Sequence, residues 1–288
     1  MSTQSTKLSR SFVNKFLYRA VLLTVICPAL AAAEAAAQPS AATPDQAASD
    51  AENRGKVIAI EADRRDSGYI DSESTIKMTL RDKKGRERVR TLRIKAMERP
   101  DDGDWSMTIF DEPADVEGTA LLTYSHGLEP DDQWLYLPAL KRVKRISSKN
   151  KSGPFMGSEF AFEDLSSFEL EKYKFRYLRN ETCGDDSCTV SEWVPVYDHS
   201  GYSRTEVWHD TNHYRTRRID FFDRTGKPLK VLTLDNFKLH NERFWRAHHW
   251  LMVNHLTGKS TIIETEKIAL GVGLDKRDFD KNSLKSAR

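Results

Sequence analysis

The stretch Asp132-Gln-Trp-Leu-Tyr-Leu-Pro138 decides how the centre of this chain folds. Apolar side chains occupy both alternate sets of positions, as in a β-strand that is buried on both faces. The strand leads into the basic segment Lys141 to Lys151, which contains no acidic residue, and then into the loop Gly153-Pro-Phe-Met-Gly-Ser158. An ordinary core does not require such a loop. The sequence therefore indicates a surface that holds an apolar ligand beside positive charge.

Hydrophobic residues alternate with a period of two along most of the chain, which predicts strands. One clear case runs from Thr75 to Arg81, after which Lys83-Lys-Gly85 turns the chain into Arg88 to Ala96. Further strands follow as far as Ile268, and Asp223-Arg-Thr-Gly226 predicts another hairpin turn. We expect roughly ten or eleven antiparallel strands and short helices at 54–65, 162–168 and 275–279. Because so long a sheet cannot stay flat, the expected fold is mainly β (α+β), an incomplete half-barrel curled around helices.

The N-terminal residues predict export. Basic residues precede the apolar run Ala20 to Ala33, which is too short to span a bilayer comfortably and ends in small residues, as a secretory signal peptide does. Cleavage after residue 33 or 37 fits a small-x-small site, so residues 1–37 are the expected signal peptide. Residues 38–52 are rich in Ala, Pro, Ser and Thr and predict a flexible lead. The remaining residues, 53–288, are expected to form a single periplasmic domain.

Cleavage of this signal would leave two cysteines, Cys183 and Cys188, separated by Gly-Asp-Asp-Ser. In an exported chain this pattern predicts a disulfide that closes a hairpin tip. A redox motif would be tighter, and a metal site would need neighbouring histidines. Two alternatives concern the N-terminus: an uncleaved anchor, and acylation of Cys27, which is preceded by Ile26 where a small residue is needed.

Several functional classes find little support. The chain has 45 Lys+Arg and 43 Asp+Glu, so its net charge is near zero and nucleic-acid binding is not expected. Gly201-Tyr-Ser-Arg lacks the second glycine of a nucleophile elbow and lies among strands. Asp131-Asp132 and Asp185-Asp186 lie at turns, where carboxylates cap backbone amides. We therefore expect neither an enzyme nor a cofactor.

The histidines do not predict a metal site. His209 and His213 have a four-residue spacing, but Asp210-Thr-Asn212 between them predicts a turn between strands and not a helix. The chain's histidines are therefore interpreted as exposed residues at strand ends, and no metal is expected.

Several motifs follow one another in a specific order. They are Met107-Thr-Ile-Phe110 with Pro113 and Gly118-Thr119, Asp132-Gln-Trp-Leu-Tyr-Leu-Pro138, Arg142-Val-Lys-Arg-Ile146, Phe155-Met-Gly-Ser-Glu-Phe160, Glu163-Asp-Leu165 and Asp223-Arg-Thr-Gly-Lys-Pro228. Their order resembles the LolA-like outer-membrane lipoprotein-sorting proteins, in the large branch typically encoded beside RND-type exporters, and the resemblance spans about Val57 to the C-terminus. It implies an incomplete β-barrel with helices as a lid over an apolar cavity for acyl chains. No single arginine that would lock such a lid can be identified.

A carrier of acyl chains needs an apolar cavity that can adapt, since each buried methylene contributes about 0.8 kcal/mol and release must remain possible. Aromatic residues and Met, whose side chain repacks easily, suit this role. For the strand residues an ordinary core is an equal alternative, whereas Phe155 and Met156, on a glycine-flanked loop, favour binding. The residues expected to line the cavity are Trp105, Met107, Ile109, Trp134, Tyr136, Phe155, Met156, Phe160 and Phe162.

The basic segment has two interpretations. Lys141, Arg142, Lys144 and Arg145 are expected to dock anionic lipid headgroups or an acidic partner surface. Alternatively, they belong to a solvated edge strand whose charges prevent aggregation. The sequence does not separate the two.

These features together predict a monomeric periplasmic carrier of lipid or lipoprotein acyl chains, with an RND-type exporter as the membrane partner implied by the resemblance. The alternative is a sensor or adaptor of the same fold that binds a protein partner in envelope signalling. A carrier should retain a hydrophobic ligand through purification, and an adaptor should be empty. An enzyme acting on a lipid headgroup would need a polar cluster at the cavity mouth, which the sequence does not predict.

Overall fold

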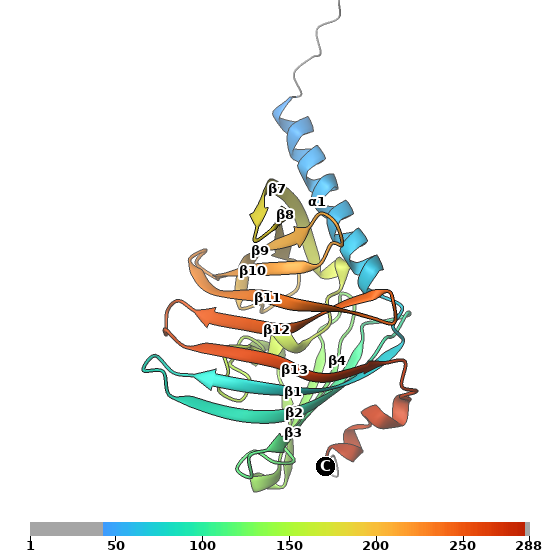
Figure 1. Cartoon of the computed structure of the whole chain (residues 1–288), viewed down its shortest axis with the longest axis vertical. Helices are drawn as coiled ribbons and strands as arrows, with labels where there is room; N and C mark the ends of the chain where they lie inside the picture. The colour runs from blue at the N-terminus through green and yellow to red at the C-terminus, as the bar shows by residue number, and fades with distance from the viewer. Residues whose placement is uncertain (1–42, 286–288) are drawn as a thin grey trace, which may run out of the picture. The chain divides into compact units, whose positions relative to one another are not determined.

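The computed structural model describes residues 43–285, in which thirteen strands form one antiparallel sheet. The order is β6-β5-β4-β3-β2-β1-β13-β12-β11-β10-β9-β8-β7, and the sheet curls without closing (Figure 1). This confirms the mainly β half-barrel, with more strands than the ten or eleven expected. The strands are β1 (Asp71–Arg81), β2 (Glu87–Met97), β3 (Trp105–Glu112), β4 (Ala120–Tyr124), β5 (Asp132–Leu137), β6 (Arg142–Ile146), β7 (Tyr173–Cys183), β8 (Asp186–Pro195), β9 (Tyr202–Asp210), β10 (Thr216–Asp223), β11 (Pro228–His240), β12 (Phe244–Asn254) and β13 (Ser260–Leu270).

Short hairpin connections build most of the sheet, and one long-range pairing joins its two halves. The predicted turn at Lys83-Lys-Gly85 joins β1 to β2, with Gly85 at φ 80°, a conformation that favours glycine. The long-range pairing brings β1 beside β13, with Ser72 opposite Leu270. The edges of the sheet are therefore β6 and β7, which are the strands on either side of the longest connection in the chain.

The helix α1 (Pro44–Asp66) is longer than the sequence predicted. We expected a helix only over 54–65 and a flexible lead over 38–52, but residues 44–52 are helical. The helix begins at an N-cap, because the Thr43 side chain accepts from the Gln46 amide and Pro44 occupies the first turn. The Ala, Pro, Ser and Thr composition of residues 38–52 did not indicate a helix. The helix packs along the edge strand β7 (Figure 1). The predicted signal peptide lies outside the described residues.

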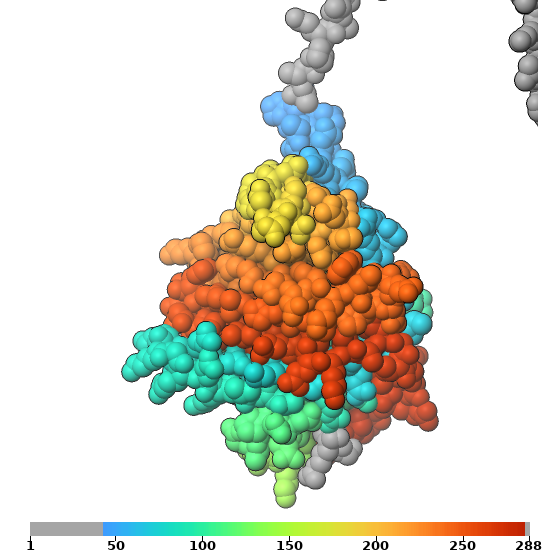
Figure 2. All heavy atoms as spheres, viewed as in Figure 1, coloured from blue at the N-terminus to red at the C-terminus, as the bar shows by residue number. Residues whose placement is uncertain are grey.

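The sheet has two apolar faces, each covered by a different segment. The 147–172 connection between β6 and β7, here called the plug segment, covers one face, which we call the inner face. The last part of the described chain covers β3 to β5 on the other, outer face. Figure 2 shows β11, β12, β13, β1 and β2 as a continuous surface of the molecule.

The short helices are single 3-10 turns. Those in the plug segment include η3 (Phe162–Leu165) and η4 (Leu170–Lys172), and those of the C-terminal part are η5 (Lys276–Phe279) and η6 (Lys281–Lys285). The expected helices at 162–168 and 275–279 thus exist in shortened form. Within residues 43–285 no helix has both the length and the apolar character needed to cross a membrane.

Candidate functional site

The inner face and the plug segment together form the candidate site. Phe155 and Phe160 of the plug segment are almost completely buried, at 1% and 3% exposure. The Phe155 ring packs between Phe110 of β3 and Phe162, with ring centroids 5.6 Å away from each. Met156 and Phe162 pack against the same cluster, which extends over β1, β2 and β10 to β13. The plug segment therefore covers the apolar inner face.

A buried arginine holds the tip of the plug segment. Arg90 of β2 donates from Nη1 to the Met156 carbonyl over 2.7 Å, and its guanidinium lies 5.5 Å from the centre of the Phe110 ring. Burial lowers the pKa of Arg90. No arginine that would hold a lid could be identified from the sequence. Arg90 gives no such signal, because it stands in a predicted strand far in sequence from Met156.

Two buried ion-pair groups fasten the rest of the segment. Lys230 of β11 contacts the Asp164 carboxylate over 2.5 Å and donates to the Glu159 carbonyl over 3.0 Å. The Lys230 and Asp164 side chains are only 4% and 7% exposed. Asp164 also accepts from the Tyr202 hydroxyl over 2.7 Å. The plug segment thus supplies the carboxylate that pairs with the buried Lys230 side chain, and loss of either partner would leave the other buried and unpaired.

The second group ties both ends of the plug segment to one carboxylate. Asp131 contacts Lys172 over 2.5 Å and Lys151 over 3.2 Å. Burial alone would raise the pKa of Asp131, but the two lysines, Lys172 foremost, hold that pKa below its ordinary value. Asp131 also accepts from the His126 amide, as expected for a turn carboxylate. Its larger role as an anchor was not predicted, since its partners lie far along the chain.

A cleft of about 590 Å³ opens beside the plug segment. It lies between residues 152–161 and the turns that follow β10 and β12, and its volume falls in the range typical of small-molecule sites. Phe160 and Tyr202 line it and also belong to the inner apolar cluster, so the cleft leads toward that cluster. Several side chains that line this cleft are polar, although the sequence did not predict a polar cluster at a cavity mouth. Among them, the Asn254 side-chain amide donates to the Glu159 carboxylate over 2.7 Å.

The structure does not bring all the predicted cavity residues together. Phe155, Met156, Phe160 and Phe162 lie at the inner face. The strand residues lie in the other cluster, on the outer face, against Phe279 and Leu284 of the C-terminal part; they are Trp105, Met107, Ile109, Trp134 and Tyr136. Expecting one cavity was therefore wrong for the strand residues. The reason is that both faces of β3 and β5 are covered, and the alternate set, including Phe110 and Leu135, is the one that faces the plug segment.

The predicted docking segment lies on an edge strand. β6 is the first strand of the sheet order, and Arg142 and Lys144 on it are exposed, as is Lys141 before it. Arg145 forms an ion pair with Asp132 of β5. This placement fits the edge-strand interpretation, while docking stays a prediction.

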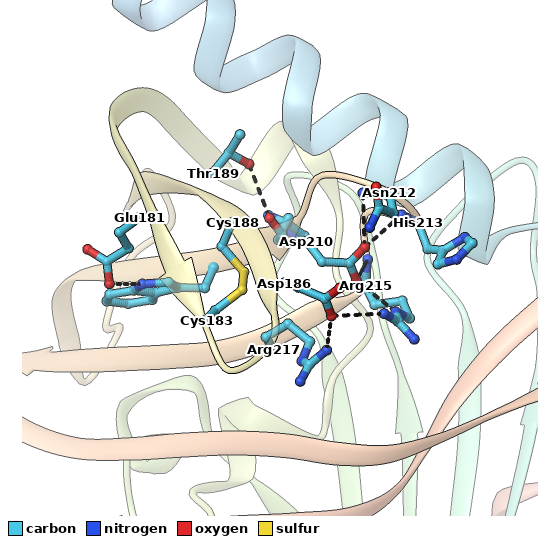
Figure 3. Close-up of a disulfide and its surroundings, with 12 residues drawn as sticks. Glu181, Cys183, Asp186, Cys188, Thr189, Asp210, Asn212, His213, Arg215 and Arg217 are labelled. Atoms are coloured by element: carbon cyan, nitrogen blue, oxygen red, sulfur yellow. Dashed lines mark hydrogen bonds and ion pairs between the residues drawn. A yellow bond between two sulfur atoms is a disulfide. The ribbon is translucent and has the colours of Figure 1, made fainter.

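The predicted disulfide is confirmed. Cys183 and Cys188 are bonded at the tip of the β7–β8 hairpin, as Figure 3 shows. Asp186 in this tip contacts Arg217 of β10 over 2.6 Å and Arg215 of the β9–β10 turn over 3.4 Å. These two ion pairs hold the hairpin tip against β10 and the turn before it.

The histidines of this region differ from expectation. His209 is 1% exposed, and its ring stacks on that of Trp193 with centroids 5.7 Å apart. Burial lowers its pKa to about 4. His213 is exposed in the turn that follows β9, as expected. The expected exposure was wrong for His209, because its burial depends on Trp193 of the neighbouring strand β8, which lies sixteen positions away in the sequence.

The geometry offers no hydrolase arrangement around Ser203, which lies inside β9 and not at a strand-to-helix turn. Among residues 43–285, no group of three or more His, Cys, Asp or Glu residues converges as a metal site would require. The described site is thus an apolar face covered by the plug segment.

Comparisons with known proteins agree with this geometry. A family model described as an uncharacterized protein matches residues 102–286. A domain from Vibrio parahaemolyticus named for outer-membrane lipoprotein sorting is 50% identical, with a TM-score of 0.80 over 81% of this chain and 99% of that one. A DUF1329 family protein from Desulfovibrio piger is 27% identical, with a TM-score of 0.78 over 81% and 99%. A LolA superfamily protein from Nitrosomonas europaea shares the fold, at 20% identity and a TM-score of 0.64 over 79% and 98%. No curated protein matches the chain.

Proposed function

Because this chain belongs to the family of outer-membrane lipoprotein-sorting proteins and has the LolA-like fold, we propose that it is a periplasmic carrier of lipid or lipoprotein acyl chains. One observation carries the proposal. The inner apolar face is covered by a segment that contains only short 3-10 turns and one isolated β-bridge, and that is fastened to the sheet by side chains such as Arg90 and Lys230 and not by a ladder of backbone hydrogen bonds. A cover of this kind can move aside without breaking the sheet.

The energetics permit exchange between the plug segment and a ligand. An acyl chain of about 16 carbons gains roughly 12 kcal/mol if every methylene is buried at ~0.8 kcal/mol. Displacing Phe155, Phe160 and Phe162 loses roughly 5 to 9 kcal/mol, at about 1.5 to 3 kcal/mol for each ring. The two terms are of similar size, so binding is favourable and release remains possible, as a carrier requires.

The cleft beside residues 152–161 is the proposed entrance. It opens to solvent at one end and reaches Phe160 and Tyr202 of the inner cluster at the other. An acyl chain entering here would move the tip of the plug segment away from Arg90, while its polar end would remain near Lys259 and Arg224 at the mouth. The proposed binding residues are thus Phe155, Met156, Phe160 and Phe162.

Location and partners complete the proposal. The Cys183–Cys188 disulfide supports an oxidising compartment, in line with the predicted signal peptide. An RND-type exporter is proposed as the membrane partner on the sequence resemblance, and the basic edge strand β6 as the surface that meets a membrane or a partner.

Native mass spectrometry of the mature protein isolated from the periplasm tests the carrier function. We expect a bound acyl species that organic extraction removes, and its loss in Met156→Asp, which places a charge on the inner face. Val89→Asp is the matched control, because Val89 is exposed on the same sheet at 46% and lies outside the inner cluster. If the folded wild-type protein is empty and takes up no offered oleate or phospholipid, the carrier function is wrong and the adaptor alternative gains.

Docking by β6 needs a separate experiment. Changing Lys141, Arg142, Lys144 and Arg145 to Gln should weaken sedimentation with vesicles that contain anionic lipid. Changing Lys83 and Lys84 of the β1–β2 turn to Gln is the control, since they are also exposed lysines. Equal sedimentation of both variants and the wild type would rule out lipid docking by β6.

A further inference from the structure

The edge strand β6 is open on one side. It pairs with β5 alone, and within residues 43–285 none of its residues forms a backbone hydrogen bond outside that ladder. The other edge of the sheet differs, because α1 packs along β7 (Figure 1) and a Cβ at Gly55 would lie 2.7 Å from the Tyr177 backbone nitrogen. The N–H and C=O groups along the free side of β6 are therefore available to a further strand.

The register of β6 fixes where its side chains lie. Arg142 and Lys144 stand opposite Leu137 and Leu135 of β5, which belong to the inner apolar cluster. Residues directly opposite each other lie on the same face of a sheet, so both cations flank the inner face. Val143 between them packs against the outer cluster. The free edge thus presents a cation, an apolar side chain and a second cation on alternating faces.

The charge on this edge has one sign. Arg142 and Lys144 are exposed and have no acidic partner within residues 43–285, whereas Arg145 is paired with Asp132. Residues 141–151 contain no acidic residue that could pair with them locally. A strand with acidic side chains placed beside β6 would therefore meet two unpaired cations.

Other occupants fit this edge poorly. A second copy of β6 would oppose basic residues with basic residues, because four of the five residues 141–145 are Lys or Arg. Residues 1–42 contain one acidic residue, Glu34, and so lack the complementary charge. A lipid headgroup can meet the cations but cannot form a ladder of hydrogen bonds with a strand. An extended acidic polypeptide meets both requirements.

Starting from the docking role proposed for β6, we propose that its partner is a protein segment that adds to the sheet as one further strand. The segment should have acidic residues opposite Arg142 and Lys144 and an apolar residue between them, beside Val143. Backbone hydrogen bonds hold such a strand, and the charged pairs select it. The sequence left lipid and protein open as partners, because only the register with β5 shows which faces these side chains share.

Fluorescence anisotropy with a labelled peptide of alternating Glu and Val residues tests this surface. We expect saturable binding to the mature protein, and binding at least about tenfold weaker when every backbone amide of the peptide is N-methylated, since that peptide keeps its charge but cannot donate. Arg142→Glu with Lys144→Glu should weaken binding of the unmethylated peptide by a similar factor, and should favour a peptide of alternating Lys and Val instead. Lys83→Glu with Lys84→Glu is the control and should bind like the wild type, because both lysines are exposed in the β1–β2 turn.

Hydrogen exchange locates the bound peptide. Amides of residues 142–146 should exchange more slowly in the complex, while amides of β7, along which α1 packs, keep their rates. Circular dichroism checks that the charge-reversed variants are folded, as expected for exposed side chains.

Strand addition is ruled out if the wild type does not bind the peptide saturably, if the N-methylated peptide binds equally well, or if reversal at residues 83 and 84 weakens binding as much as reversal at 142 and 144. Binding of β6 to anionic vesicles without binding of the peptide would also rule it out, and would leave lipid docking standing. The carrier function is judged separately, by the bound acyl species in native mass spectrometry.

Discussion

Replacing Lys230 with methionine should release the plug segment without unfolding the sheet. The Lys230 Nζ lies 2.5 Å from Asp164 and both side chains are almost fully buried. Removing one partner of such a pair costs about 3 to 5 kcal/mol. Asp164 keeps the Tyr202 hydroxyl and the Ala161 amide as donors, so we expect the lower end, about 3 kcal/mol. This corresponds to a roughly 150-fold larger open population of the plug segment.

Hydrogen exchange under native conditions measures this opening. The amides of Phe155, Phe162 and Glu163 are bonded to carbonyls within the plug segment, at Phe160, Gly153 and Lys151 respectively. We expect them to exchange roughly 100-fold faster in Lys230→Met, whereas amides in β1 and β13 keep their wild-type rates. An exposed lysine, Lys174, changed to methionine controls for the loss of a charge.

Two results would refute this reasoning. Unchanged exchange in the plug segment would mean that the ion pair does not hold it closed. Equal acceleration in the plug segment and in β1 would mean that the cover cannot open apart from the sheet. The double variant Lys230→Met/Asp164→Asn offers a further check, because the amide removes the unpaired charge while its oxygen can still accept from Tyr202 or Ala161, so exchange should slow again.

Other changes test the remaining structure. Cys183→Ser with Cys188→Ser should lower the free energy of unfolding by about 2 kcal/mol, as expected for a short closed loop, and a urea titration that matches the wild type would contradict this. Gly55→Ala should lower the unfolding temperature, because a Cβ would lie 2.7 Å from the Tyr177 backbone nitrogen; a rise would show that helix propensity outweighs the clash. The pKa of His209 is about 4 in the folded protein and 6.5 ordinarily. As the pH falls, the unfolded chain therefore binds this proton at a higher pH than the folded protein does. The free energy of unfolding should fall by up to about 3 kcal/mol as the pH drops through this interval. In His209→Gln the urea concentration at half-unfolding should therefore change less between pH 7 and pH 4.5 than it does in the wild type.

Much of the fold could be predicted from local patterns. The alternation that predicts β1 and β2 depends only on neighbouring residues, and so does the turn at Gly85. The disulfide was predictable for the same reason, since Cys183 and Cys188 are five positions apart in one hairpin. The first turns of α1 were not predicted although Thr43 and Pro44 signal them, because the alanine-rich composition of residues 38–52 is also typical of a flexible lead.

The candidate site was only partly predictable. The loop with Phe155 and Met156 was recognised by its composition, and both residues lie at the inner face. The strand residues Trp105 and Trp134 were assigned to the same cavity, but they lie in the outer-face cluster. A strand that is apolar on both faces contains no information about which face its neighbours will cover.

The sequence alone therefore determined the strands, the turns between them and the disulfide, because each depends on residues close together in the chain. Only the tertiary structure decided which face of β3 and β5 meets the plug segment, and it alone brought Arg90 to Met156 and Lys230 to Asp164. Those contacts depend on the register of many strands at once and on where a long connection returns to the sheet. Alternation within a single strand carries neither kind of information.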